Sequence, residues 1–300
     1  MPIDRSRMLR DYNRGLTPPV RAAHRMLAPL SRLISPIWIW SGLPHTRPWA
    51  RPLIIATLAT SLLLPFDGLI ARASRDAAIG GDARRVLGWF GEYGQGGMII
   101  LTVALVFLLD KHNTRRLLDY ALALILAAAA TLPLKMLTGR PRPRESMLET
   151  YTHLDFLGPF GSHPFSPQVG VRHAWEFWAD TNAALWSMPS SHVVYAVVMS
   201  VWLAALYPPL RTLAWILAAL VAVARVLFGA HYPTDVIVGA ALGYLIATPC
   251  ITRLWGIRLL DWIWQVVVDP DAPPAAPRFE HHRSRPADAP RCRSAAGTSR

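Results

Sequence analysis

Long apolar segments alternate with short polar ones along most of the chain, and six of them are long enough to cross a bilayer. A transmembrane helix takes about 20 apolar residues, and runs this continuous favour helices over the alternating pattern of membrane β-strands. The predicted spans lie near residues 53–71, 93–109, 117–134, 190–207, 212–229 and 235–252. We therefore expect an all-α integral membrane protein, built as a six-transmembrane helix bundle.

The two ends of the chain differ from this middle part. Residues 1–48 are rich in arginine and predict a basic cytoplasmic or interfacial segment, which precedes the six-helix domain at 49–253. Residues 254–268 mix tryptophans with charged side chains and predict an interfacial amphipathic segment. The Pro-, Ala- and Arg-rich composition of residues 269–300 predicts a disordered basic tail.

The composition agrees with a membrane protein and excludes several other classes. Hydrophobic residues make up 52% of the 300 residues and charged residues 17%, whereas a soluble domain carries about 25% charged residues. Cys250 and Cys292 lie in very different settings and predict no disulfide framework. The net charge of +12 is spread over tails and loops without a nucleic-acid motif. Membrane lipids, and not nucleic acid, are the expected partners.

The distribution of lysine and arginine predicts how the bundle is oriented. Cytoplasmic loops carry an excess of these residues, and the short loop between the second and third spans holds Lys111, Arg115 and Arg116. Both termini are therefore predicted to be cytoplasmic. The loops after the first, third and fifth spans then lie on the outer face.

Three clusters of charged and polar residues lie at the predicted outer ends of the spans. They comprise Lys135, Arg140, Arg142 and Arg144; Pro189, Ser190, Ser191 and His192; and Arg225, His231 and Asp235. A charged residue at the centre of a membrane helix costs roughly 2.5–3.5 kcal/mol, and less near an edge. Each residue alone fits an anchor at the membrane surface, but their common face favours a shared site.

The cations and the serines suit the binding of a phosphoryl group. Lys135, Arg142 and Arg225 supply positive charge, and guanidinium groups match phosphate oxygens in pairs. Ser190 and Ser191 stand where a helix is predicted to begin, and free backbone N–H groups there favour an anion.

The two histidines add the means to transfer that group. A neutral imidazole attacks phosphorus, and a protonated one donates to the departing oxygen. Asp235 follows His231 by four residues, so its carboxylate can hold one ring nitrogen and fix the attacking tautomer.

These three clusters together resemble the signature motifs of a known family. Lys135-x6-Arg142-Pro143, Pro189-Ser190-Ser191-His192 and Arg225-x5-His231-x3-Asp235 are similar to the three motifs of the type 2 phosphatidic acid phosphatase (PAP2) superfamily. At about 5% usage per residue type, all three occur in order by chance in about one chain in a hundred thousand. The resemblance covers roughly residues 50–250 and extends to the six-helix membrane branch of the family.

The resemblance implies a role for each motif residue. His231 is the implied nucleophile that forms a phosphohistidine, Asp235 orients it, and His192 protonates the leaving oxygen and then activates water. The phosphoryl oxygens are bound by Lys135, Arg142, Arg225 and the Ser190–Ser191 backbone. Neither a cofactor nor a metal is implied, and the spacing of His153, His163 and His173 matches no metal-ligand pattern.

Two positions depart from the family pattern. Ser191 stands where glycine is usual, and Ala224 stands where a serine usually precedes the arginine. Glycine matters if its position needs unusual dihedral angles, and a lost hydrogen bond to a charged group costs about 1.5–3 kcal/mol. Because neither change removes the nucleophile, the acid or a cation, we expect a working site.

The resemblance predicts a membrane phosphatase acting on a lipid phosphate or diphosphate. Undecaprenyl diphosphate, phosphatidic acid, phosphatidylglycerol phosphate and lipid A are the candidate substrates, with a weak preference for the polyprenyl carrier. The site is expected to face the periplasm of a bacterial inner membrane. The aromatic-rich loop at 145–188 is expected to anchor at the interface and to receive the lipid chain.

Other functions stay open on the sequence. A lipid-to-lipid phosphotransferase uses the same site with a hydroxyl acceptor in place of water. Vanadate-dependent haloperoxidases resemble the same phosphate site, but they are soluble, which six apolar spans argue against. A membrane scaffold with a relic site is the non-enzymatic alternative, given Ser191 and Ala224.

Overall fold

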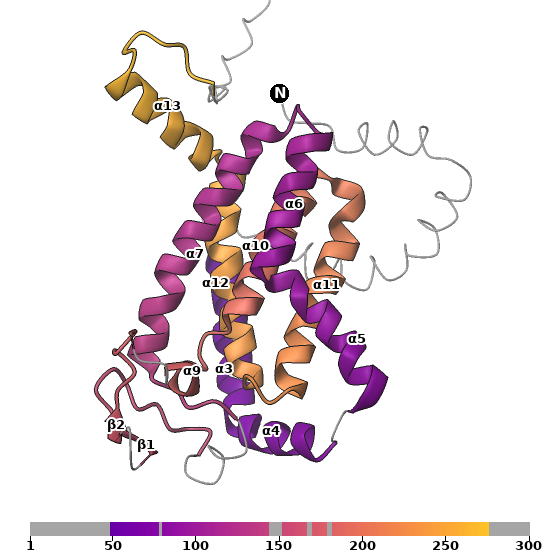
Figure 1. Cartoon of the computed structure of the whole chain (residues 1–300), viewed down its shortest axis with the longest axis vertical. Coiled ribbons are helices and arrows are strands. Elements are labelled where there is room, and N and C mark those ends of the chain that lie inside the picture. Colours follow the sequence, from indigo (N-terminus) through magenta and orange to yellow (C-terminus); the bar gives the residue numbers. More distant parts are fainter. Residues whose placement is uncertain (1–48, 78–79, 144–151, 167–169, 179–181, 276–300) are drawn as a thin grey trace, which may run out of the picture. The chain divides into compact units, whose positions relative to one another are not determined.

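A computed structural model describes residues 49–77, 80–143, 152–166, 170–178 and 182–275, and its helices form a bundle (Figure 1). The predictions for residues 1–48 and for most of the C-terminal tail lie outside the described residues. The helices are α3 (Ala50–Leu63), α4 (Asp67–Asp76), α5 (Gly81–Gly91), α6 (Gly96–Leu109), α7 (Leu117–Thr138), α9 (Asn182–Leu185), α10 (Ser191–Leu206), α11 (Arg211–Leu227), α12 (Pro233–Thr252) and α13 (Trp255–Val267). Short 3-10 turns connect several of them: η1 (Leu64–Phe66), η2 (Glu92–Gly94), η3 (Thr114–Arg116) and η4 (Pro208–Leu210).

Each of the six predicted spans coincides with helical structure, but the count of six is not confirmed. Within the described residues, four helices are long and apolar enough to cross a membrane: Ala50–Asp76, Thr114–Thr138, Pro208–Leu227 and Pro233–Thr252. The pair Gly81–Gly94 and Gly96–Leu109, bent by 59°, is a fifth if it forms one span. Helix α10 has 16 residues and a length of about 24 Å, shorter than a hydrocarbon core of about 30 Å.

Helix α10 is the central element of the bundle. Its buried positions are Val193, Val194, Ala196, Val197, Val198, Met199, Ser200, Trp202 and Ala204. Helix α12 approaches it closely because Gly239 and Gly243 face its backbone, and a Cβ atom at Gly243 would lie 2.5 Å from the Val194 carbonyl oxygen. Small residues spaced four apart allow such contacts between membrane helices.

Four helix ends meet at one end of the bundle. Helices α7 and α11 end there, and α10 and α12 begin there (Figure 1). Helix α7 ends just before Gly139, which adopts the left-handed conformation (φ +52°). A Cβ atom at Gly139 would collide with the backbone of Gly158. The Ser190 backbone N–H, just before α10, donates to the Asp235 carbonyl in the first turn of α12, at 3.1 Å.

The loop at 145–188 contains a short hairpin, so the chain is mostly helical and not wholly α. Strands β1 (His163–Ser166) and β2 (Gly170–Arg172) pair in antiparallel fashion, with His163 opposite Arg172. The strands were not predicted from the sequence because each has only three or four residues and lacks a repeated apolar pattern.

The segment predicted at 254–268 is the amphipathic helix α13. Leu254 adopts the left-handed conformation (φ 57°) and turns the chain away from α12. The buried Asp119 carboxylate accepts the N–H groups of Gly256 and Ile257 at 2.9 and 3.2 Å, which fixes α13 at the end of α7 remote from Gly139. The segment is thus helical, while its position at a membrane surface stays a prediction.

Candidate active site

All eight residues predicted for the site meet at the end of the bundle where α10 and α12 begin. Lys135, Ser190, His231 and Asp235 are buried, whereas Arg142, Ser191, His192 and Arg225 keep partial solvent access. The charges of Lys135 and Arg142 act on both histidines, and that of Arg225 acts on His192. The site therefore combines four buried residues with four that solvent can partly reach.

His231 lies in the short link between α11 and α12 and is 2% exposed. Its Nδ1 lies 2.7 Å from the backbone carbonyl oxygen of Ser187, so Nδ1 carries the proton and donates it there. The carboxylate of Asp235 lies 3.8 Å from the same nitrogen, which differs from the direct hydrogen bond expected from the sequence. Because Nδ1 is the donor, the lone pair of Nε2 is available as a nucleophile.

Burial controls the protonation of this histidine. Desolvation disfavours the imidazolium and lowers the pKa of His231 from 6.5 to about 4, although Asp235 opposes the shift. His231 is therefore neutral at physiological pH, as a nucleophile must be.

Asp235 occupies the first turn of α12, with both carboxylate oxygens bonded. One oxygen accepts the Arg140 guanidinium at 2.5 Å. The other accepts the Ser187 hydroxyl at 2.5 Å and the Tyr232 N–H at 2.8 Å. Ser187 thus binds both partners, Asp235 through its hydroxyl and His231 through its carbonyl.

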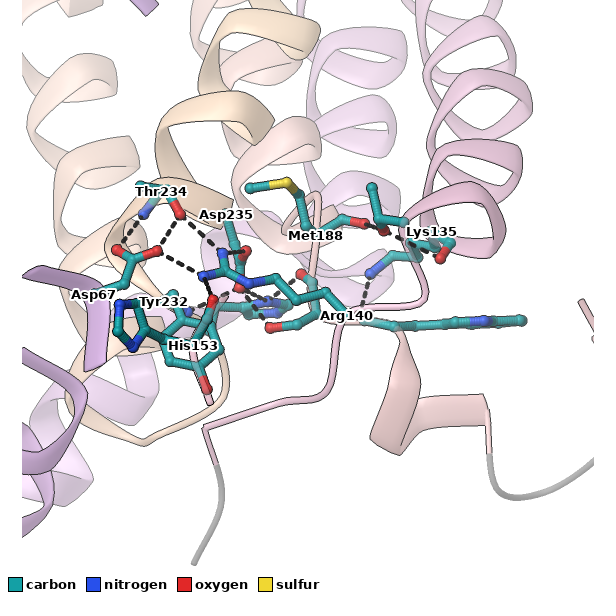
Figure 2. Close-up of polar contacts among 12 residues, drawn as sticks. Asp67, Lys135, Arg140, His153, Met188, Tyr232, Thr234 and Asp235 are labelled. Atoms are coloured by element: carbon teal, nitrogen blue, oxygen red, sulfur yellow. Dashed lines mark hydrogen bonds and ion pairs between the residues drawn. The ribbon is translucent and has the colours of Figure 1, made fainter. Parts of the chain in front are cut away.

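Arg140 is the residue of this region to which the sequence analysis assigned no role. It is fully buried, and Figure 2 shows its guanidinium between Asp67 and Asp235. Its Nη2 donates to Asp67 at 2.8 Å and to the His153 carbonyl at 2.6 Å. Its Nη1 donates to Thr234 Oγ1 at 2.8 Å as well as to Asp235. Two features of the sequence could have indicated this contact: Asp67 is a charged residue in an apolar span, and Arg140 lies between two helix ends.

The cations around His231 come from three different elements. Lys135, in the last turn of α7, donates from Nζ to the Trp186 carbonyl at 2.8 Å, which orients its side chain. Arg225, in the last turn of α11, packs against Gly91, where a Cβ atom would lie 3.2 Å from the guanidinium. Arg142 lies in the segment after α7 and donates its backbone N–H to the Ala184 carbonyl at 2.9 Å.

The start of α10 offers fewer backbone donors than the sequence indicated. The Ser190 N–H is already bonded to the Asp235 carbonyl, whereas residues in the first turn of a helix keep free N–H groups. Among the described residues, the buried Ser190 hydroxyl has no hydrogen-bond partner. An anion at this helix end can therefore use the N–H groups from Ser191 onward and the Ser190 hydroxyl.

The two departures from the family pattern fit the backbone. Among the described residues, Leu254 is the one non-glycine residue with a positive φ, so Ser191 occupies an ordinary conformation and does not require glycine. Ala224 is fully buried one position before Arg225.

Metal-ligating side chains do not gather in the part of the chain that the structure describes. No group of three or more His, Cys, Asp or Glu residues there has a geometry that could hold a metal ion. The three loop histidines make separate contacts: the His153 carbonyl accepts Arg140, His173 Nδ1 lies 3.3 Å from the Gly161 carbonyl, and His163 is buried beside β2.

The helix bundle carries a cluster of cations and histidines at one end. Residues 116–258 match the model of the PAP2 superfamily, and this range contains all eight predicted site residues. The matched range is just under half of the chain, and over it the chain is similar to the PAP2 superfamily.

Two solved structures are similar to the chain. LpxE from Aquifex aeolicus shares 20% identity, covers 63% of this chain and 94% of its own, and has a TM-score of 0.43. A transmembrane PAP2 type phosphatidylglycerolphosphate phosphatase from Bacillus subtilis shares 16% identity, covers 71% and 98% of the two chains, and has a TM-score of 0.43. Among curated proteins, nothing matches the chain.

Proposed function

We propose that this protein is a membrane lipid phosphatase that hydrolyses a lipid phosphate or diphosphate through a phosphohistidine on His231. The observation that carries the proposal is the hydrogen bond from His231 Nδ1 to the Ser187 carbonyl, which leaves Nε2 as the nucleophile. The charges of Lys135 and Arg142 act on this imidazole, so a phosphate placed against Nε2 would lie in a positive field.

In the first step, Nε2 of His231 attacks phosphorus and the bond from phosphorus to the lipid oxygen breaks. His192 donates a proton to the departing oxygen, which leaves as a lipid alcohol or, from a diphosphate, as a lipid monophosphate. Lys135, Arg142 and Arg225 stabilise the negative charge on the three equatorial oxygens, which is the main task of a protein in phosphoryl transfer.

In the second step, water attacks phosphorus while the bond to Nε2 breaks. His192, now neutral, takes the proton of the water. Inorganic phosphate is released, and neutral His231 is regenerated. The negative charge of Asp235, 3.8 Å from Nδ1, stabilises the positive charge that the imidazole carries while phosphorus is attached.

The finer assignments rest on the sequence patterns. We propose that the bundle crosses the bacterial inner membrane six times, with α10 as its short central span, both termini in the cytoplasm and the site facing the periplasm. Undecaprenyl diphosphate, phosphatidic acid, phosphatidylglycerol phosphate and lipid A are the substrates to compare. The exposed side chains of Phe160, Phe177 and Trp178, in the loop between two motifs, are suited to contact the lipid chain.

The test is phosphate release by detergent-purified protein from these four lipids, with a chelator present. The wild type and His173→Ala are expected to release phosphate, because His173 lies outside the cluster around His231, whereas His231→Ala is expected to be inactive. Equal activity of His231→Ala and the wild type would overturn the proposal. Transfer of phosphate to a second lipid, in place of release, would assign a phosphotransferase.

A further inference from the structure

We propose that Asp67 and Arg140 are positioning residues for this reaction, acting on His231 through Asp235. The inference rests on the proposed function. Asp67 lies at the start of α4, outside the matched range 116–258, so the element that completes the site comes from the N-terminal part of the bundle.

Arg140 connects the two carboxylates directly. Each of its terminal nitrogens contacts a different aspartate, Asp235 at 2.5 Å and Asp67 at 2.8 Å, and all three side chains are at most 1% exposed. The aromatic rings of Phe156 and Tyr232 lie 4.9 and 4.1 Å from the guanidinium carbon. Arg140 is therefore enclosed by protein groups and has no access to bulk water, which strengthens its electrostatic contacts.

The charge balance explains why a second carboxylate is present. A buried arginine paired with Asp235 alone would neutralise the charge that must stabilise the phosphorylated imidazole. With Asp67 on its other side, the three residues carry a net charge of −1, and Asp235 keeps a negative field toward His231 3.8 Å away.

Asp67 also fixes the start of helix α12. One of its oxygens accepts the Thr234 N–H at 3.2 Å, and the other accepts the Thr234 hydroxyl (Figure 2). A carboxylate at a helix N-terminus is favoured by the helix dipole. Thr234 immediately precedes Asp235, so this contact sets the position of the carboxylate relative to His231.

The test compares Asp67→Asn with the matched control Asp76→Asn, a change of the same kind at the other end of α4. The Asp76 side chain is 69% exposed and pairs with Arg75, so this variant is expected to keep the wild-type rate. Asp67→Asn removes the charge but keeps the size, and we expect kcat to fall about 10- to 100-fold. KM and inhibition by inorganic phosphate are expected to change less than about twofold, because the phosphate-binding cations are untouched.

A pH profile separates positioning from a general loss of structure. Loss of the Asp67 charge makes the surroundings of His231 more positive, which disfavours the protonated ring. In the pH profile of kcat/KM, the limb that reports protonation of His231 is therefore expected to move to lower pH. Asp67→Glu, which keeps the charge, is expected to restore the wild-type position of this limb even if its rate is reduced. Thermal unfolding in detergent identifies variants that fail to fold.

Two outcomes would overturn the inference. One is a folded Asp67→Asn protein with wild-type kcat, and the other is a fall in kcat with an equal weakening of phosphate inhibition and an unmoved pH profile. Failure of the proposed function is distinguishable from both, because His231→Ala would then keep the wild-type rate of phosphate release.

Discussion

Nδ1 of His231 donates to the backbone carbonyl of Ser187 at 2.7 Å, and this contact selects the tautomer in which Nε2 is unprotonated. A carbonyl oxygen accepts hydrogen bonds and cannot donate one, so the orientation does not depend on the protonation of a neighbouring acid. Asp235 is left to act as a charge 3.8 Å away. The orienting bond and the stabilising charge are thus supplied by two different residues.

The pH dependence of activity follows from the burial of His231. Because its pKa is lowered to about 4, the neutral reactive form is present above that pH and is lost as the pH falls through it. We expect ¹⁵N NMR of histidine-labelled protein, assigned with His231→Ala, to show a neutral Nδ1–H ring at pH 6. A ring that titrates near pH 6.5, the ordinary value for histidine, would contradict this prediction.

Ser187→Ala tests the hydroxyl that holds Asp235. The variant keeps the carbonyl that binds His231 but loses the 2.5 Å bond to the carboxylate. A hydrogen bond to a charged group contributes about 1.5–3 kcal/mol, so we expect kcat to fall about 10-fold or more.

Ser200→Ala is the matched control for Ser187→Ala, because it removes another buried serine hydroxyl, bonded to Ala196 and Ala214 in the interior of the bundle. Its expected effect on kcat is less than about twofold, although the protein loses stability. Equal effects of the two variants on kcat would show that Ser187 has no special role.

Ser191→Gly restores the residue usual in the family. Ser191 has an ordinary backbone conformation, so there is no strain for glycine to relieve. We expect kcat/KM for phosphate release to stay within about threefold of the wild type, since the N–H groups at the start of α10 are unchanged. An increase above tenfold would show that the serine side chain obstructs the phosphate.

Trp178→Ala tests the aromatic loop. Trp178 is 62% exposed, and Trp175 and Phe177 both pack edge-on against it at 5.0 Å. Removing it is expected to raise KM for a long-chain lipid phosphate about 3- to 10-fold and to leave a short-chain soluble analogue unaffected.

Trp262→Ala is the control for Trp178→Ala, because Trp262 is 61% exposed on α13 at the other end of α7. This variant is expected to leave KM unchanged for both substrates. A rise in KM for the short-chain analogue with Trp178→Ala would place Trp178 at the phosphate and not at the lipid chain.

The sequence predicted most of the helices and all eight residues that cluster at the site, because both depend on local patterns. Apolar runs mark α7 and α12, and each motif lies at a helix end, where a charged side chain can reach the membrane surface. The boundaries were less accurate: α7 continues past Pro133 and ends at Thr138, just before the left-handed Gly139. Neighbouring membrane helices tolerate such an internal proline.

The features that sequence reasoning missed depend on contacts between distant residues. Arg140 lies 73 residues from Asp67 and 95 from Asp235, and no local spacing links them. The bend between α5 and α6 was not predicted because charged residues interrupt the apolar pattern in α5, so α5 was not assigned to a span. Ser187 lies just outside the second motif, and its contact with His231 uses a backbone carbonyl, which every residue possesses.

The central claim is that His231 carries the phosphoryl group during turnover. The most direct measurement is rapid quenching of the reaction with a ³²P-labelled lipid phosphate, followed by a test for acid-labile, base-stable label on the protein. We predict a phosphoenzyme in the wild type, a longer-lived one in His192→Ala with a good leaving group, and none in His231→Ala. Label retained by His231→Ala, or phosphate release without a labelled protein in His192→Ala, would contradict the account.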